Sequence, residues 1–190
     1  MTRETERCRT ALLLASQGET VAVVCSGDAG VYGMAGLIYE LSEQFPPVDI
    51  EIIPGVTAAL AGAAVLGAPL THDFAVVSLS DLLTPWELIE KRLSAAAAAD
   101  FCIALYNPAS KKRSDYLRKA CDILLRHKPP ETVCGLVRNI GREGQRAEEV
   151  MLLEQLGRAQ ADMFTTVFIG NAQTKKLNGK MVTPRGYRFE

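Results

Sequence analysis

Apolar residues follow two patterns along the chain, one typical of buried strands and one typical of amphipathic helices. Short continuous apolar runs rich in β-branched residues predict strands covered on both faces, and spacings of three and four predict helices between them. The predicted strands are 21–25, 49–53, 74–79, 101–106, 132–138 and 165–169. The predicted helices are 5–17, 31–41, 58–66, 84–97 and 114–127, while 149–156 is a weaker segment that fits either a strand or a helix.

This alternation predicts an α/β protein with mainly parallel sheets. A connector at 68–73 divides the chain into an N-terminal domain, 1–70, and a C-terminal domain, 74–190. Ligands of such folds bind at the carboxyl ends of the strands, and each predicted strand ends in small or polar residues. Those ends are Gly27-Asp28, Pro54-Gly55, Ser80-Asp81, Tyr106-Asn107, Arg138-Asn139 and Gly170-Asn171.

The glycine-rich turn after the first predicted strand is the most informative of these ends. Its small residues allow a tight turn and the close approach of a ligand. The start of the next helix favours an anion, and Asp28 can accept a hydrogen bond from an amine or a sugar hydroxyl. The alternative is purely structural, with Asp28 capping the helix and the glycines making the turn.

Local signals add three expectations about single elements. Thr84-Pro85-Trp86-Glu87 has the pattern of a capping box with proline at the first helical position. Thr57 is a plausible N-cap for the helix over 58–66. Asn178-Gly179, between Lys176-Leu177 and Lys180-Met181-Val182, predicts a hairpin turn.

Composition narrows the class of protein. The chain has 190 residues, 48% hydrophobic and 23% charged, with a net charge of −1, which argues against general nucleic-acid binding. No apolar run approaches the ~20 residues that span a bilayer, and the start lacks a signal-peptide core. We therefore expect a cytoplasmic protein without a membrane partner.

Cysteine and histidine usage argues against a metal site. The five cysteines lack CxxC spacing, and only two histidines are present. Cys25, Cys102 and Cys134 lie in apolar runs, so buried free thiols are expected rather than disulfides or metal ligands. No metal is predicted.

Seven motifs follow one another in an order that resembles a known family. They are Gly-Asp-Ala-Gly-Val-Tyr-Gly (27–33), Ile-Pro-Gly-Val-Thr-Ala (53–58), Ser-Leu-Ser-Asp-Leu-Leu-Thr-Pro-Trp (78–86), Leu-Tyr-Asn-Pro (105–108), Arg-Asn-Ile-Gly-Arg (138–142), Thr-Thr-Val-Phe-Ile-Gly-Asn (165–171) and Met-Val-Thr-Pro-Arg-Gly-Tyr (181–187). Together they resemble the precorrin-3B C(17)-methyltransferases of cobalamin biosynthesis, within the tetrapyrrole methylase family. The resemblance covers nearly the whole chain.

The resemblance implies two α/β domains that bind S-adenosylmethionine between them, with a tetrapyrrole in a trough above it. Members of this branch methylate carbon 17 of the macrocycle and promote ring contraction. The substrate is either precorrin-3B or its cobalt-containing counterpart, cobalt-factor III, and a homodimer is expected. The positions that carry over to the cofactor are Gly27, Asp28, Gly30, Val31, Tyr32, Thr57, Ala58, Leu105, Tyr106, Asn139, Ile140, Gly170 and Asn171.

The chain departs from the family pattern in two places. Ala29 stands where the family usually has proline, which keeps the turn with a less rigid backbone. Nothing matches the family's opening strand and Gly-x-Gly-Pro-Gly loop, so the first domain is expected to lack its opening strands and to leave an unpaired edge. Reduced or no activity is expected from this chain alone. The alternative function is a non-catalytic tetrapyrrole- or nucleotide-binding fragment.

The implied substrate carries many carboxylates, which need cationic partners, and Arg binds a carboxylate through two parallel hydrogen bonds. The candidate substrate-binding residues are Asp81, Lys111, Lys112, Arg113, Arg138, Arg142 and Arg185. The Lys-Lys-Arg run fits a solvated face equally well.

The methyl donor is already activated, so no protein nucleophile is needed, and no catalytic residue is assigned. Asp81, His72 and Tyr106 are candidates for an acid or base in ring contraction. The alternatives are a helix cap for Asp81 and a solvated linker residue for His72.

Overall fold

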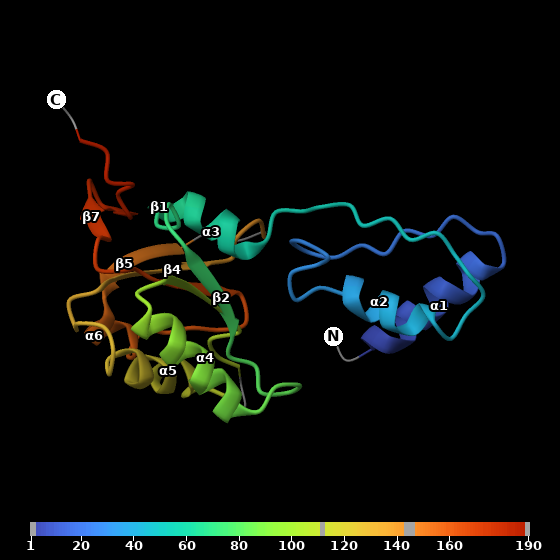
Figure 1. Cartoon of the computed structure of the whole chain (residues 1–190), viewed down its shortest axis with the longest axis horizontal. Helices are drawn as coiled ribbons and strands as arrows, with labels where there is room; N and C mark the ends of the chain where they lie inside the picture. The colour runs from blue at the N-terminus through green and yellow to red at the C-terminus, as the bar shows by residue number, and fades with distance from the viewer. Residues whose placement is uncertain (1–2, 111–112, 143–146, 189–190) are drawn as a thin grey trace. The chain divides into compact units, whose positions relative to one another are not determined.

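The computed structural model describes residues 3–110, 113–142 and 147–188 (Figure 1). Contacts divide the chain into two compact units, Met1–Ala58 and Ala59–Glu190. The division falls before the connector at 68–73, because the helix over 58–66 packs with the second unit and not with the first. The sequence had assigned that helix to the first domain.

The first unit has two helices, α1 (Glu4–Ser16) and α2 (Ala35–Ser42), around a small core of Cys8, Leu12 and Leu41. The strands predicted at 21–25 and 49–53 are absent, since neither segment is paired in a sheet. A strand needs a hydrogen-bonded neighbour, and the described part of this unit supplies none. Helix α2 also begins at Ala35 rather than Val31, because residues 27–34 form turns.

The second unit contains all the described strands and four helices. Its helices are α3 (Ala58–Leu66), α4 (Trp86–Ala98), α5 (Tyr116–Leu124) and α6 (Leu153–Leu156). The strands are β1 (Gly67–Ala68), β2 (Phe74–Ser78), β3 (Cys102–Tyr106), β4 (Val133–Arg138), β5 (Ala147–Leu152), β6 (Thr165–Ile169), β7 (Lys175–Leu177) and β8 (Lys180–Val182). The weak segment at 149–156 is thus the end of a strand followed by a short helix.

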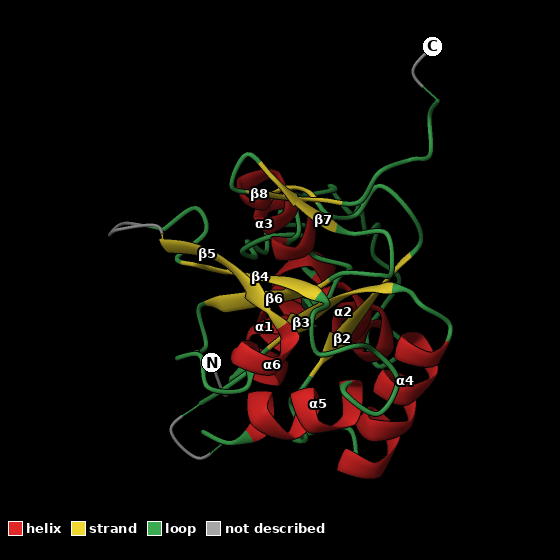
Figure 2. Ribbon diagram, turned by 90° about the vertical axis from the view of Figure 1, so that its left-hand side faces the viewer, coloured by secondary structure: helices red, strands yellow, loops and turns green. Residues whose placement is uncertain are grey.

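One five-stranded sheet, in the order β2-β3-β6-β4-β5, forms the centre of this unit. Helices α4, α5 and α6 cover one face, while α3 and the small sheet β1-β8-β7 cover the other (Figure 2). Apolar side chains fill both interfaces, with Leu93 and Leu124 on the first and Leu66, Phe168 and Met181 on the second. The predicted hairpin is confirmed, with Asn178 and Gly179 both at positive φ between β7 and β8.

The sheets are mixed, so the α/β class is confirmed but the expectation of mainly parallel sheets is wrong. Strand β2 pairs parallel with β3, whereas β6 is antiparallel to both of its neighbours, β3 and β4. The cause is the β4–β5 pair, which is antiparallel and reverses the chain direction before the connection to β6. The carboxyl ends of β2, β3 and β4 therefore share one edge of the sheet with the start of β6, and β6 ends at the opposite edge.

Two glycines allow α3 to lie very close to the sheet. A Cβ at Gly62 would stand 2.8 Å from the Phe168 ring and 3.1 Å from Ile140 Cδ1. A Cβ at Gly135 would stand 2.7 Å from Leu66 Cδ1.

The expected capping box of α4 is not formed, since its N-cap is Pro85 and no side-chain cap hydrogen bond is present.

We expect Gly62→Ala to destabilise the second unit by about 1–3 kcal/mol, because the added methyl group overpacks the α3 interface. The measurement is urea unfolding of the full chain followed by the fluorescence of Trp86, the single tryptophan, which lies in this unit. Ala64→Ser on the exposed side of the same helix is the control and should change stability little. Equal effects of both substitutions would contradict the close packing.

Candidate functional site

In the first unit, Asp28 joins the two loops that follow the extended segments. Its Oδ1 accepts a hydrogen bond from the Gly30 N–H at 2.8 Å, and its Oδ2 accepts one from the Gly55 N–H at 2.9 Å. Asp28 does not cap α2, whose N-cap is Met34. The capping role expected as the structural alternative is therefore wrong, and the carboxylate is instead the junction of loops 26–31 and 54–57.

Close backbone approach explains the glycines of both loops. A Cβ at Gly55 would collide with the Gly27 carbonyl oxygen, and one at Gly33 would collide with the Ala29 carbonyl. Tyr32, directly before Gly33, has a φ of 54°, a strained conformation for a large residue, and its side chain is mostly exposed. The turn thus presents Tyr32 and backbone groups around a fixed carboxylate.

The hydrogen bonds from Gly55 and Gly30 lower the pKa of Asp28 below its usual value. Because the folded-state pKa is depressed, the stabilisation by these bonds is complete above the ordinary carboxyl pKa of about 3.9. It is lost as the pH falls through the folded-state pKa.

We expect the amide resonances of Gly30 and Gly55 to shift together below pH 4, with a midpoint under the ordinary Asp value. NMR titration from pH 6 to acid measures this, and Asp28→Asn, which has no ionisable group there, should abolish the shared midpoint. A midpoint at or above the ordinary value would contradict the junction.

In the second unit, polar residues gather where β2, β3 and β4 end. Asn107 Nδ2 donates to Ser78 Oγ at 3.0 Å, and the Ala59 N–H in the first turn of α3 donates to the Tyr106 hydroxyl at 2.6 Å. Asn107 and Asn139 both have positive φ, so each strand turns sharply as it ends. This edge, with Ser78, Tyr106, Asn107 and Asn139, is the candidate site of the unit.

The start of β6 belongs to the same edge, which the sequence did not indicate. The Asn139 N–H donates to the Phe164 carbonyl at 3.1 Å, and Arg142 lies over the Phe164 ring with its guanidinium 4.4 Å from the ring centre. Met163 and Phe164 are both partly exposed there. No local sequence signal locates them, because it is the antiparallel direction of β6 that brings its first residues, not its last, to this edge.

Gly170 and Asn171 are not at this edge, so the expectation that they join Tyr106 and Asn139 is wrong. They follow β6 at the opposite edge, where the Gly170 N–H donates to the Val133 carbonyl at 2.9 Å. A Cβ at Gly170 would stand 2.5 Å from Thr174 Cβ, and the Asn171 N–H donates to Thr174 Oγ1 at 2.9 Å. Both residues serve the turn between β6 and β7.

We expect Gly170→Ala to destabilise the second unit by about 1–3 kcal/mol through the Thr174 clash. Thermal unfolding followed by Trp86 fluorescence measures the change. Gly157→Ala is the matched control, since a Cβ there meets Cys121 Cβ only at 3.5 Å, an ordinary contact. A stable Gly170→Ala variant would contradict the structural role.

Asp81 and Arg113 form a hydrogen-bonded cluster beside the candidate edge. Arg113 Nη1 donates to Ser80 Oγ at 2.8 Å and to Asp81 Oδ1 at 3.1 Å, and the Tyr116 hydroxyl donates to Asp81 Oδ2 at 2.5 Å. The Tyr116 hydrogen bond, with Arg113, lowers the pKa of Asp81, and the same bond raises the pKa of Tyr116. Asp81 therefore stays ionised and is better suited to hold Arg113 than to act as an acid or base.

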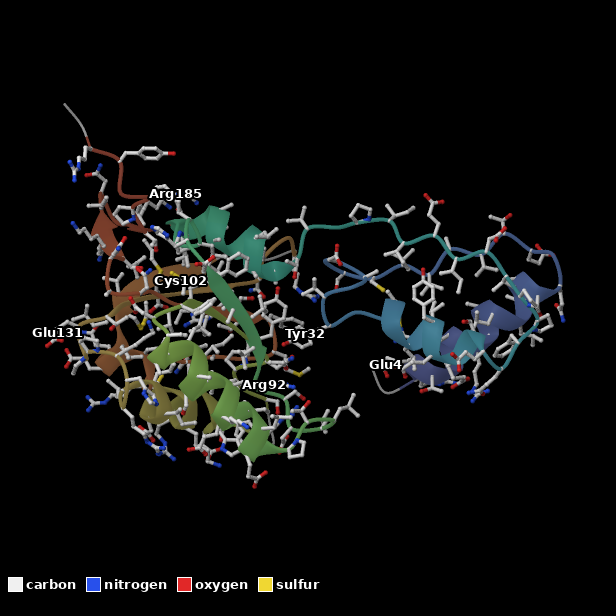
Figure 3. All side chains as sticks on the ribbon, in the orientation of Figure 1. Glu4, Tyr32, Arg92, Cys102, Glu131 and Arg185 are labelled. Atoms are coloured by element: carbon white, nitrogen blue, oxygen red, sulfur yellow. The ribbon has the colours of Figure 1, made fainter. Side chains whose placement is uncertain are left out.

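The other predicted cationic residues are scattered. Arg138 pairs with Glu149 and the Gln160 carbonyl at the start of the β4–β5 hairpin. Arg185, labelled on the C-terminal segment in Figure 3, donates to the Thr71 carbonyl before β2, and His72 contacts the Pro184 carbonyl there. Arg185 and His72 thus lie at the amino end of β2, away from the candidate edge. Lys111 and Lys112 lie outside the described residues.

The cysteine thiols, and the described side chains of the types that bind metals, form no reactive centre. Cys102 and Cys134 are buried as predicted, while Cys25 is only half-buried. Burial raises the pKa of Cys121 to about 12 and raises that of Cys134 as well. Across residues 3–110, 113–142 and 147–188, no cluster of three or more His, Cys, Asp or Glu side chains could hold a metal ion. No helix in this part of the chain is long and apolar enough to cross a membrane.

Comparison with known proteins places these features in a family. Residues 2–157 match the family of tetrapyrrole (corrin/porphyrin) methylases. A probable cobalt-factor III C(17)-methyltransferase of Salmonella typhimurium is 48% identical over 98% of this chain and 78% of its own length. A cobalt-factor III methyltransferase of Priestia megaterium is 47% identical over 99% of this chain, which spans 36% of that protein. The crystal structure of the methyltransferase CobJ, 41% identical, aligns with a TM-score of 0.89 over 95% of this chain and 77% of that one.

Proposed function

The chain belongs to the tetrapyrrole methylase family, and we propose that it transfers a methyl group from S-adenosylmethionine to carbon 17 of a corrin precursor, with ring contraction. The names of the relatives that are 48% and 47% identical support cobalt-factor III as the precursor, with precorrin-3B as the metal-free alternative. The observation that carries the proposal is the 48% identity to the Salmonella typhimurium relative over 98% of this chain.

The chemistry asks the protein mainly to hold and orient two ligands. The sulfonium of the donor is already a strong electrophile, so alignment with the attacking carbon and exclusion of water supply most of the catalysis. We assign cofactor contacts to Gly27, Asp28, Gly30, Val31, Tyr32, Thr57 and Ala58 in the first unit. In the second unit we assign them to Leu105, Tyr106, Asn139 and Ile140, and we add Met163 and Phe164 in place of Gly170 and Asn171.

Asp28 accepts backbone hydrogen bonds from Gly30 and Gly55, and a carboxylate offers about four lone-pair sites, so it can still accept from an amine or hydroxyl of the cofactor. Asp28→Ala is therefore expected to weaken S-adenosylhomocysteine binding at least about tenfold, or about 1.4 kcal/mol.

Isothermal titration of the full chain measures this affinity, after thermal unfolding has shown that each variant is folded. Glu40→Gln, on the exposed surface of α2, is the control and should bind like the parent chain. Unchanged affinity of a folded Asp28→Ala variant would remove Asp28 from the cofactor site.

For the macrocycle we assign Arg113 to a substrate carboxylate, with Asp81 as its positioning residue. Arg113 makes three hydrogen bonds, to Ser80, Asp81 and Ser110, which fix the guanidinium and reduce the entropy lost on binding. Arg138, Arg142 and Arg185 already have other partners, which are Glu149, the Phe164 ring and the Thr71 carbonyl respectively.

We expect Arg113→Ala to weaken cobalt-factor III binding about tenfold or more, and Asp81→Asn to weaken it less, because the cation remains but is no longer fixed. Absorbance titration of the macrocycle measures both, while S-adenosylhomocysteine affinity should stay unchanged. Arg92→Ala on α4 is the control for loss of a surface cation. Equal loss in all three variants would indicate a general charge effect.

The second candidate function is a tetrapyrrole-binding fragment without turnover. The unpaired segments of the first unit favour it, because the loops that follow them lack the support of a sheet. Transfer of a radiolabelled methyl group to cobalt-factor III distinguishes the two functions. Binding of both ligands without label transfer supports the fragment, and label transfer supports the enzyme.

A further inference from the structure

The loop between β2 and α4 carries two adjacent leucines that face solvent. Leu82 is 77% exposed and Leu83 is 97% exposed. The loop, drawn in green, projects from the second unit beyond the end of β2 (Figure 1). Isolated apolar side chains are common on protein surfaces, but two neighbouring leucines with so little protein contact are unusual. They add little to the core of the second unit, so their apolar surface is available to a ligand.

One residue, Tyr116, holds both ends of this loop. Its hydroxyl donates to Asp81 Oδ2 at 2.5 Å, and its ring lies against that of Trp86 with 4.7 Å between the ring centres. Leu82 and Leu83 lie between these two anchors. The leucines are therefore presented by a loop that is already restrained, and a ligand that contacts them orders little additional chain.

A guanidinium is fixed directly beside the two leucines. Arg113 Nη1 donates to Asp81, the residue before Leu82, at 3.1 Å, and also to Ser80 Oγ at 2.8 Å. The end of β2 thus combines an apolar pair with a cation, next to the polar edge that contains Ser78. A ligand that matches this combination has an apolar surface next to a carboxylate. A flat macrocycle with acidic groups around its rim has both.

The size of the apolar surface favours a small ligand over a protein partner. Each partner in a stable protein complex buries about 800 Å². The tips of two leucines supply only a small part of such an area. They are large enough, however, to cover part of one ring face, where an apolar contact replaces water on both sides.

We propose that Leu82 and Leu83 contact an apolar face of the macrocycle while Arg113 binds one of its carboxylates. The inference rests on the proposed function and adds to it the residues that recognise the ring itself. The two contacts differ in their response to salt, because dissolved ions screen the attraction of a guanidinium for a carboxylate but leave an apolar contact intact.

The test is absorbance titration of the full chain with cobalt-factor III. The double variant Leu82→Ser/Leu83→Ser is expected to bind at least about tenfold more weakly than the parent chain, because two apolar side chains leave the contact. Leu82→Met/Leu83→Met keeps apolar side chains of similar size and should bind within about twofold of the parent. Leu177→Ser removes an exposed leucine of β7 and is the matched control, which should bind like the parent.

Salt separates the leucine contact from the cationic one. When the titrations are repeated at about tenfold higher ionic strength, the loss caused by the double serine variant should persist, whereas the loss caused by Arg113→Ala should shrink. The affinity for S-adenosylhomocysteine and the midpoint of thermal unfolding should be the same in the double serine variant as in the parent, because the side chains removed are exposed.

The outcomes distinguish this inference from the proposed function. If the parent binds cobalt-factor III and the double serine variant binds it equally well, the inference is overturned and the proposed function stands. If the parent does not bind the macrocycle, the proposed function fails and the inference fails with it. A lower unfolding midpoint or a smaller sedimentation coefficient of the double serine variant would also overturn the inference, since the leucines would then be covered by this chain or by a second copy.

Discussion

The direction of β6 is the constraint on which the candidate site depends. This strand lies between β3 and β4 and is antiparallel to both. Its orientation places Phe164 beside Asn139 and moves Gly170 to the far edge of the sheet. The sequence grouped four strand ends of the second unit, but the reversal at the β4–β5 hairpin separates Gly170-Asn171 from the other three. Strand direction therefore decides which residues meet at a site built from strand ends, and residue type matters only for the residues that meet there.

Local patterns predicted the local structure of the second unit well. Helix α3 has the predicted bounds, and β2, β3, β4 and β6 begin and end within about a residue of prediction. Periodicity and turn chemistry are properties of neighbouring residues, as at Asn178-Gly179, so a single sequence contains them. Strand direction and the close approach of Gly62 to Phe168 are set by distant residues, and no local pattern encodes them. The boundary near residue 70 failed for the same reason, since α3 packs with a sheet formed later in the chain.

The Asp28 turn shows why a motif with two interpretations could not be resolved by sequence. Both interpretations assumed that the nearest helix begins at Val31, but the chain first makes turns through Met34. The partner that decides the role of Asp28 is Gly55, which lies 27 residues away. The carboxylate satisfies backbone donors from two loops, and its lowered pKa follows from those bonds. A structural role of this kind is compatible with a ligand, because it fixes the charge in place beforehand.

The two units differ in what holds their candidate residues. In the second unit, Tyr106 ends β3 and Asn139 follows β4, and both strands are paired on both sides, so the sheet fixes the positions of these residues. In the first unit, the loops around Asp28 follow segments without sheet partners, and two hydrogen bonds to one carboxylate connect them. An exposed carboxylate with two bonds restrains a loop much less than a central strand does, because solvent competes for each bond. Cofactor affinity should therefore depend on how firmly these two loops are held as much as on the residues that contact the ligand.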